Sequence, residues 1–394
     1  MKQEGLSRLN KEPSPVRTPR NALFAAVLAG LMASPASAES FKTEKAEIEV
    51  TTIASGLDHP WGMAMLPDGS LLVTERAGRM LHIANEGADS PVTALSGVPQ
   101  VAARGQGGLL DVVVDEDFAN SRRLWFTWSE RGQGGFSTAL STATLSADHA
   151  ALENVEKIFV MARKTTTGHH FGSRIVLAPD GKLFMTMGER GDPGRAQDFF
   201  DHAGSVIRLN RDGSVPADNP FADGSKGLPE IWSKGHRNPQ GAAWNMAEGR
   251  LWTVEHGAKG GDEINRPEPG RNYGWPVISY GVNYDGSKVG IGSEAAGYEQ
   301  PVHYWDPSIA PSGMAFYDGA LFPQWQGSLF VGALKYQLLV RMEVSDGAII
   351  SEERMLQGEY GRIRDVRAFA DGAIWLLTDE DDGRLLRITP AGNR

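Results

Sequence analysis

Cysteine is absent from the 394 residues of this chain, which excludes disulfides, thiolate metal sites, iron–sulfur clusters and a cysteine nucleophile. Basic residues are in the minority, with 39 Lys and Arg against 49 Asp and Glu, and the formal net charge is −10. Because an acidic chain without a basic stripe is poorly suited to a phosphate backbone, no nucleic-acid partner is expected.

Long hydrophobic runs are also missing. The longest candidate, residues 22–32, has eleven apolar residues, whereas a membrane span needs about 20. A cationic segment precedes this run, and Ala36-Ser37-Ala38 follows it, which is the pattern of a secretory signal peptide over residues 1–38. An uncleaved anchor is the alternative, and the short run disfavours it. We therefore expect a periplasmic mature chain, residues 39–394, with no membrane anchor.

Helical periodicity is absent from the mature chain, which instead alternates short apolar runs with turn residues. One unit recurs: apolar residues, a turn of the Asp-Gly type and an alternating strand. Four clear copies and two degenerate ones are found at residues 65–74, 177–186, 245–253, 369–378, 115–127 and 323–331. Repeats of this kind are typical of propeller blades, each built from four short strands.

Six copies predict an all-β chain that forms one six-bladed β-propeller over residues 39–394. We expect the strand at 47–53 to pair near the last strand, at 385–389, so that the ring closes without a free sheet edge. Two β-sandwich domains are the alternative, but no linker-like segment divides the chain. Long insertions fall in the middle of the sequence, where binding loops are expected.

Several common catalytic signatures are missing. The sequence contains no G-x-S-x-G, no H-E-x-x-H and no complete G-x-G-x-x-G. An esterase nucleophile elbow, a helical zinc-protease motif and a Rossmann nicotinamide site are therefore disfavoured.

Candidate acid–base residues precede the strand predicted at 175–177. His169 and His170 are adjacent, and on a strand they would point to opposite faces, so one of them would face a central site. Histidine is the usual general base at neutral pH, and Glu189 could orient it. Two surface histidines and a solvated carboxylate are the alternative interpretation.

Polar loops elsewhere suggest ligand contacts. Gln106 lies in a glycine-rich segment that would let a ligand approach the backbone. Arg237 and Asn238 could bind an anion or a carbonyl oxygen. The segment 255–263 combines glycines with carboxylates, which suits oxygen ligation of calcium.

Cations near the C-terminus form a further candidate site. Lys335 follows a strand, and Arg362 and Arg364 alternate, so that both would point to one face. Three such cations converging on the axis of an acidic protein would bind a polyanionic ligand. A solvated strand face is the alternative.

Taken in order, these blocks resemble the soluble aldose (glucose) dehydrogenases that use pyrroloquinoline quinone, and most closely their periplasmic aldose sugar dehydrogenase branch. The resemblance covers nearly the whole mature chain. It rests on GHRNPQG at 235–241, EHG-x-x-GGDEIN at 255–265, NYGWP at 272–276 and RIRDV at 362–366. Such a family implies a six-bladed propeller, an aldose substrate oxidised at C1 to a lactone, and a periplasmic quinone or cytochrome as electron acceptor.

The resemblance also implies residue roles. His170 would be the general base, with Glu189 orienting it, and Arg237 would stabilise negative charge on the quinone oxygens. Asn238 would bind the same quinone edge, while Gln106 and Glu189 would lie on the substrate side. Gln106 would also contact the cofactor.

Cofactor anchoring is implied by the same comparison. The clamp on the cofactor carboxylates would be formed by Lys335, Arg362 and Arg364. Calcium would be held by the carbonyls of Gly257 and Ala258 and would act as a Lewis acid, with a second metal site at Asp262 and Glu263. The family often has proline where Ala258 stands, which puts the rigidity of this loop in question.

Two other functions remain open from the residues alone. A calcium-dependent lactonase on the same fold would need calcium and a histidine but no cationic clamp. A propeller that only binds a partner would not need His170.

Overall fold

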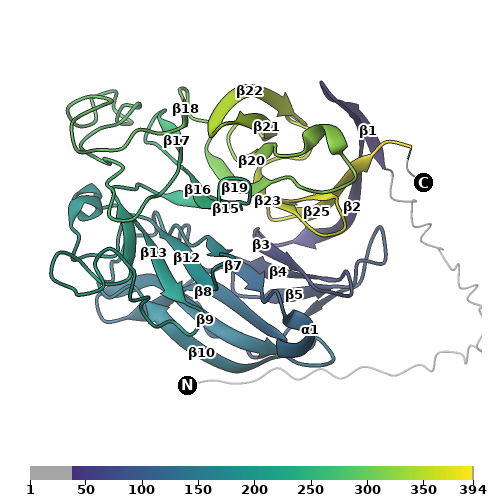
Figure 1. Cartoon of the computed structure of the whole chain (residues 1–394). Helices are drawn as coiled ribbons and strands as arrows, with labels where there is room; N and C mark the ends of the chain where they lie inside the picture. Colours follow the sequence, from purple (N-terminus) through teal and green to yellow (C-terminus); the bar gives the residue numbers. More distant parts are fainter. Residues whose placement is uncertain (1–37, 393–394) are drawn as a thin grey trace, which may run out of the picture. The chain divides into compact units, whose positions relative to one another are not determined.

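The computed structural model describes residues 38–392, and these residues form almost entirely β-structure (Figure 1). The predicted signal peptide lies outside the described residues except for Ala38. Within 38–392, no helix is long and apolar enough to cross a membrane.

The described strands form six antiparallel sheets, which confirms the predicted six-bladed propeller. Five sheets each use four consecutive strands: β3 (Pro60–Met65), β4 (Leu71–Glu75), β5 (Met80–Ile83) and β6 (Val92–Ala94); β7 (Leu109–Val114), β8 (Arg123–Gly132), β9 (Gly135–Leu145) and β10 (Leu152–Val160); β11 (Ile175–Leu177), β12 (Lys182–Met187), β13 (Ser205–Asn210) and β14 (Ile231–Lys234); β15 (Pro239–Asn245), β16 (Arg250–Glu255), β17 (Asp262–Asn265) and β18 (His303–Trp305); β19 (Pro311–Phe316), β20 (Leu329–Ala333), β21 (Leu338–Ser345) and β22 (Ala348–Met355). Short helices α1 (Phe118–Ser121), η1 (Pro193–Gln197) and η2 (Pro323–Trp325) lie in the connections.

The sixth sheet joins the two ends of the described chain. Its order is β1 (Glu39–Lys42), β2 (Glu47–Leu57), β25 (Gly383–Pro390), β24 (Ile374–Thr378) and β23 (Ile363–Ala368). Val50 pairs with Ile388, and Figure 1 shows the purple N-terminal strands beside the yellow C-terminal ones. The predicted pairing of the first and last strands is therefore confirmed.

Each repeated turn of the sequence connects the inner strand of a blade to its second strand. In the first blade, the carboxylate of Asp68 accepts the amide of Ser70 at 3.0 Å, and Gly69 takes a φ of +85°. An Asp side chain bonds readily to an amide two residues on, and glycine adopts positive φ without steric cost. The Asp–Gly pairs at 180–181 and 371–372 repeat this geometry.

The inner strands β3, β7, β11, β15, β19 and β23 contact one another in sequence around a closed ring. Apolar side chains fill the space between neighbouring blades, and Trp125, Trp252, Trp325 and Trp375 are all fully buried. Each buried large apolar side chain contributes about 1.5–3 kcal/mol, so the interfaces between blades replace the disulfides that this chain cannot form.

A cavity of about 940 Å³ opens at the carboxyl ends of the inner strands. Its wall is mostly apolar and includes Met65, Val114, Leu177 and Phe316. No predicted site residue lines this cavity, because those residues lie at the opposite ends of the strands.

Candidate active site

The predicted site residues share one end of the inner strands. In each blade the second strand runs antiparallel to the inner strand, so residues that precede the inner strand lie beside those that follow the second one. The predicted site residues that precede an inner strand are Gln106, His170, Arg237, Asn238 and Arg362. Those that follow a second strand are Glu189, Gly257, Ala258 and Lys335, and Arg364 lies within the inner strand β23.

His170 and Glu189 form a hydrogen-bonded pair. The Nδ1 atom of His170 lies 2.7 Å from Oε1 of Glu189, and the two side chains are 14% and 2% exposed. The other oxygen of Glu189 accepts the amides of Gly191 and Asp192. Because a carboxylate only accepts hydrogen bonds, Nδ1 of the neutral imidazole carries the proton and Nε2 keeps its lone pair.

The backbone around His170 differs from the prediction. His169 and His170 lie in an irregular loop before β11 rather than on a strand, and His170 has a left-handed φ of +52°. The side-chain carbonyl of Gln106 accepts the amide of His170 at 2.8 Å. Gln106 therefore supports the loop of the candidate base, a contact that its sequence position did not reveal.

The pKa of His170 lies below its ordinary value. Burial is the main cause, and the positive charge of Arg237 adds to it, whereas the hydrogen bond with Glu189 raises the pKa. The imidazole is therefore neutral at neutral pH, the state in which it can accept a proton.

Buried side-chain nitrogen atoms without hydrogen-bond partners gather beside this pair. Nη1 of Arg237 donates to the carbonyl of His256 at 3.3 Å, and its guanidinium lies 5.2 Å from the ring centroid of Trp275. Nε of Arg237, Nε2 of His256 and Nε of Arg364 are buried without a hydrogen-bond partner among the described residues. Burial, together with the charges of Arg237, Arg364 and His170, lowers the pKa of His256 to about 3. Guanidinium N–H groups that the protein leaves without acceptors fit an anionic ligand with acceptor oxygens.

The three cations predicted to clamp the cofactor occupy different environments. Arg364 is buried and donates to the carboxylate of Asp379, while Arg362, with a side chain 44% exposed, lies 3.6 Å from the same carboxylate. Lys335 is exposed, and its ammonium lies 4.9 Å from the ring centroid of Tyr336. Arg362 and Arg364 thus converge, as their alternation predicted, and Asp379 is the shared anchor that sequence reasoning missed.

The segment predicted to hold calcium is a tight turn after β16. A Cβ on Gly257 would lie 2.1 Å from the carbonyl oxygen of Gly260 and 2.4 Å from that of Gly261, so glycine is required there. Asp262 accepts the amides of Gly257, Ile309 and Ala310. The turn therefore gathers carbonyl oxygens, which suits a hard cation.

Asp262 and Glu263 differ in what they contact. Both oxygens of Asp262 accept hydrogen bonds from the protein, including the Ser308 hydroxyl at 2.7 Å, so this carboxylate anchors the turn. Burial raises the pKa of Glu263, and the neighbouring Glu255 raises it further. Within residues 38–392 no three His, Asp or Glu side chains group as metal ligands. The second metal site remains a prediction.

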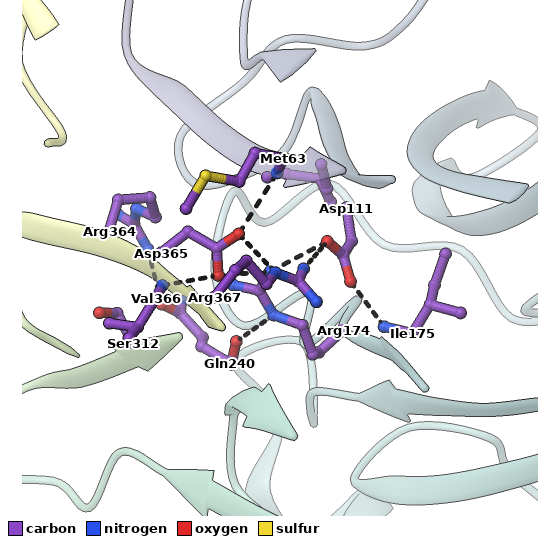
Figure 2. A network of polar contacts seen from close by, with 12 residues as sticks. Met63, Asp111, Arg174, Ile175, Gln240, Ser312, Arg364, Asp365, Val366 and Arg367 are labelled. Atoms are coloured by element: carbon purple, nitrogen blue, oxygen red, sulfur yellow. Dashed lines mark hydrogen bonds and ion pairs between the residues drawn. The ribbon is translucent and has the colours of Figure 1, made fainter. Parts of the chain in front are cut away.

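A buried ion cluster fills the axis beneath these loops (Figure 2). Nη1 of Arg174 lies 2.9 Å from both Asp111 and Asp365, and Arg367 contacts the same two carboxylates at 2.6 and 2.9 Å. Gln240 links the cluster to the site: its backbone carbonyl accepts Nε of Arg174, and its side-chain carbonyl accepts Nη1 of Arg364 at 2.8 Å. The members of this cluster come from several blades, and no sequence motif predicted that they would meet.

The glucose/sorbosone dehydrogenase family profile matches residues 57–387. The aldose sugar dehydrogenase YliI of Escherichia coli K12 is 46% identical over 350 residues, which cover 88% of this chain and 94% of that protein.

Two solved structures share the fold over most of their length. The apo form of the soluble aldose sugar dehydrogenase from E. coli has a TM-score of 0.84 and 45% identity, covering 87% of this chain and 99% of that one. The pyrroloquinoline quinone (PQQ)-bound aldose sugar dehydrogenase from Streptomyces coelicolor has a TM-score of 0.72 and 29% identity, covering 90% and 99%.

Proposed function

The chain belongs to the glucose/sorbosone dehydrogenase family, and from that premise we propose that it is a PQQ-dependent aldose sugar dehydrogenase. It oxidises the C1 hydroxyl of an aldose to the lactone. The observation that carries this function is the pairing of a neutral, oriented base with two buried guanidinium N–H groups, Nε of Arg237 and Nε of Arg364, that lack acceptors.

His170 takes the hydroxyl proton at Nε2. Glu189 holds the opposite side of the ring, which fixes the tautomer and stabilises the imidazolium that forms. The 14% exposure of the imidazole leaves it reachable from the site while most of it is shielded from water.

The residues present fit the cofactor. PQQ, when bound, accepts the hydride that leaves C1. Its carboxylates would be held by Lys335, Arg362 and Arg364, and the side chains of Arg237 and Asn238 would bind its quinone edge. The orphaned Nε atoms of Arg237 and Arg364 support this assignment, because they are donors that the protein leaves without acceptors.

The carbonyls of Gly257 and Ala258 would hold calcium beside the cofactor. This proposal is supported by the oxygen-rich turn between β16 and β17 and by the anchoring of Asp262 beneath it. We further propose export to the periplasm through the leader at residues 1–38, with a quinone or a cytochrome as electron acceptor.

Reconstitution tests the proposed function. The chain from Glu39 is purified without cofactor, PQQ and calcium are added, and dye reduction is followed with a panel of aldoses. Activity should require both additions and should fall in Arg237→Ala and His170→Ala.

A lactone substrate with calcium alone serves as the rival assay. Lactone hydrolysis without PQQ, together with no dye reduction, would favour a lactonase. No activity in either assay would leave only a binding role for the propeller.

A further inference from the structure

Arg190 is a buried cation that the proposed reaction does not use. It follows Glu189 directly, and its side chain is fully buried. Burial lowers the pKa of Arg190 to about 9. None of the ion pairs among residues 38–392 includes Arg190, and its Nε has no hydrogen-bond partner there. Burying a cation that forms no ion pair is costly, so the contacts that Arg190 does make must offset that cost.

Every contact of the Arg190 guanidinium goes to the loop that carries the candidate base. Its Nη1 donates to the carbonyl of His169, and its Nη2 donates to the carbonyl of Thr167 at 3.1 Å. The Thr167 hydroxyl in turn donates to the Arg190 carbonyl at 3.0 Å. The guanidinium also lies 3.4 Å from the ring centroid of Phe171. The residues on both sides of His170 are therefore tied to the loop that carries Glu189.

Both loops hold a residue in an unfavourable backbone conformation. His170 has a φ of +52° and Arg190 a φ of +65°, and a non-glycine residue with positive φ costs on the order of 1–2 kcal/mol. The loops are also in direct contact, because a Cβ on Gly188 would lie 2.1 Å from the carbonyl oxygen of His170. Such strain persists only where surrounding contacts enforce it, and the Arg190 guanidinium provides those contacts.

We propose that Arg190 is a positioning residue, whose guanidinium binds the loop on both sides of His170 and holds its Nε2 where the sugar hydroxyl proton is taken. The inference rests on the proposed function. Arg190 does not touch the sugar; it acts through His170, whose ring it aligns with Glu189.

Arg190→Gln and Arg190→Lys test this role in the full mature chain loaded with PQQ and calcium. The kcat of Arg190→Gln should fall about 10- to 100-fold, because misplacing a reacting group by about 1 Å costs on that order. The PQQ Kd should stay within about threefold, since no clamp residue contacts Arg190. Lysine can replace one of the two hydrogen bonds but not the planar stack, so Arg190→Lys should be intermediate.

A second readout does not need activity. Burial is the largest cause of the low pKa of His170, so a relaxed loop should raise that pKa in Arg190→Gln, measured by NMR titration of the cofactor-free protein. The groups facing His170 are Glu189, Arg237 and His169, and none of them is changed. The acid limb of kcat/KM should move to higher pH in the same variant.

Arg341→Gln is the matched control, because Arg341 is equally buried but lies in β21, paired with Glu353 at 2.8 Å. It should lower the Tm while leaving kcat and the His170 titration unchanged. If Arg190→Gln leaves kcat and the His170 titration unchanged, as this control does, the inference is wrong. If Arg190→Gln does not fold, Arg190→Lys is measured instead, and an unchanged kcat and His170 titration in that variant would also refute the inference. An inactive wild type would refute the proposed function instead, and the titration would still decide the role of Arg190.

Discussion

Replacing Glu189 by glutamine isolates the contribution of the carboxylate to the base. Oε1 of Glu189 lies 2.7 Å from Nδ1 of His170, while Oε2 accepts the amides of Gly191 and Asp192. A glutamine has only one acceptor atom, and the two backbone amides require it on their side. Its NH2 group must then face Nδ1, which moves the imidazole proton to Nε2 and removes the lone pair that takes the substrate proton.

The magnitude follows from the bond that is lost. A hydrogen bond to a charged group is worth about 1.5–3 kcal/mol, which corresponds to a loss of about 10- to 150-fold in kcat. The hydrogen bond with Glu189 raises the pKa of His170, so its removal should shift the acid limb of kcat/KM to lower pH. Activity would thus fall although more of the imidazole is neutral at pH 7.

Steady-state dye reduction of the loaded enzyme from pH 4 to 9 measures both quantities. The matched control is Glu230→Gln. Glu230 lies 3.3 Å from Nε2 of His202, and these two residues form another glutamate–histidine pair that includes no predicted site residue. Its kcat should stay within about twofold of wild type. A kcat of Glu189→Gln equal to that of Glu230→Gln would refute the tautomer argument.

Three further perturbations test other parts of the molecule. Asp365→Asn breaks the buried axial cluster, which should lower the free energy of unfolding by about 3–5 kcal/mol and the Tm by about 4–7 °C. The control Glu268→Gln, at a half-exposed ion pair, should cost under about 1 kcal/mol, and equal Tm shifts of the two variants in calorimetry would contradict this prediction. Lys335→Ala should weaken PQQ binding about 10- to 150-fold in a fluorescence titration, and an unchanged Kd would remove Lys335 from the clamp. Chelation of calcium should lower the Tm of the loaded protein, and added calcium should raise it less in Asp262→Asn; a Tm insensitive to chelator would contradict the metal proposal.

The repeat turns were enough to predict the fold, because each Asp–Gly turn has a local cause. The carboxylate of Asp68 accepts an amide only two residues away, and Gly69 itself adopts the positive φ. A short sequence pattern is therefore enough to predict the turn. The same holds for the order of polar loops along the chain, since every blade presents the same strand ends to the same face.

Contacts between blades could not be predicted in this way. Asp111 and Arg367 are far apart in sequence and meet only because the ring closes, and no spacing rule connects them. The irregular loop around His170 was missed for a related reason. Its left-handed conformation is stabilised by Gln106 and Arg190 from neighbouring segments rather than by its own residues.

The closing sheet also has a consequence for the order of folding. Val50 and Ile388 pair although roughly 340 residues separate them, and joining ends over that distance costs about 5 kcal/mol in chain entropy. During synthesis the first strand must therefore wait, with an open edge, until the last strand has emerged. The five blades between them use only consecutive strands and can form earlier, so completion of the ring is governed by the arrival of β25.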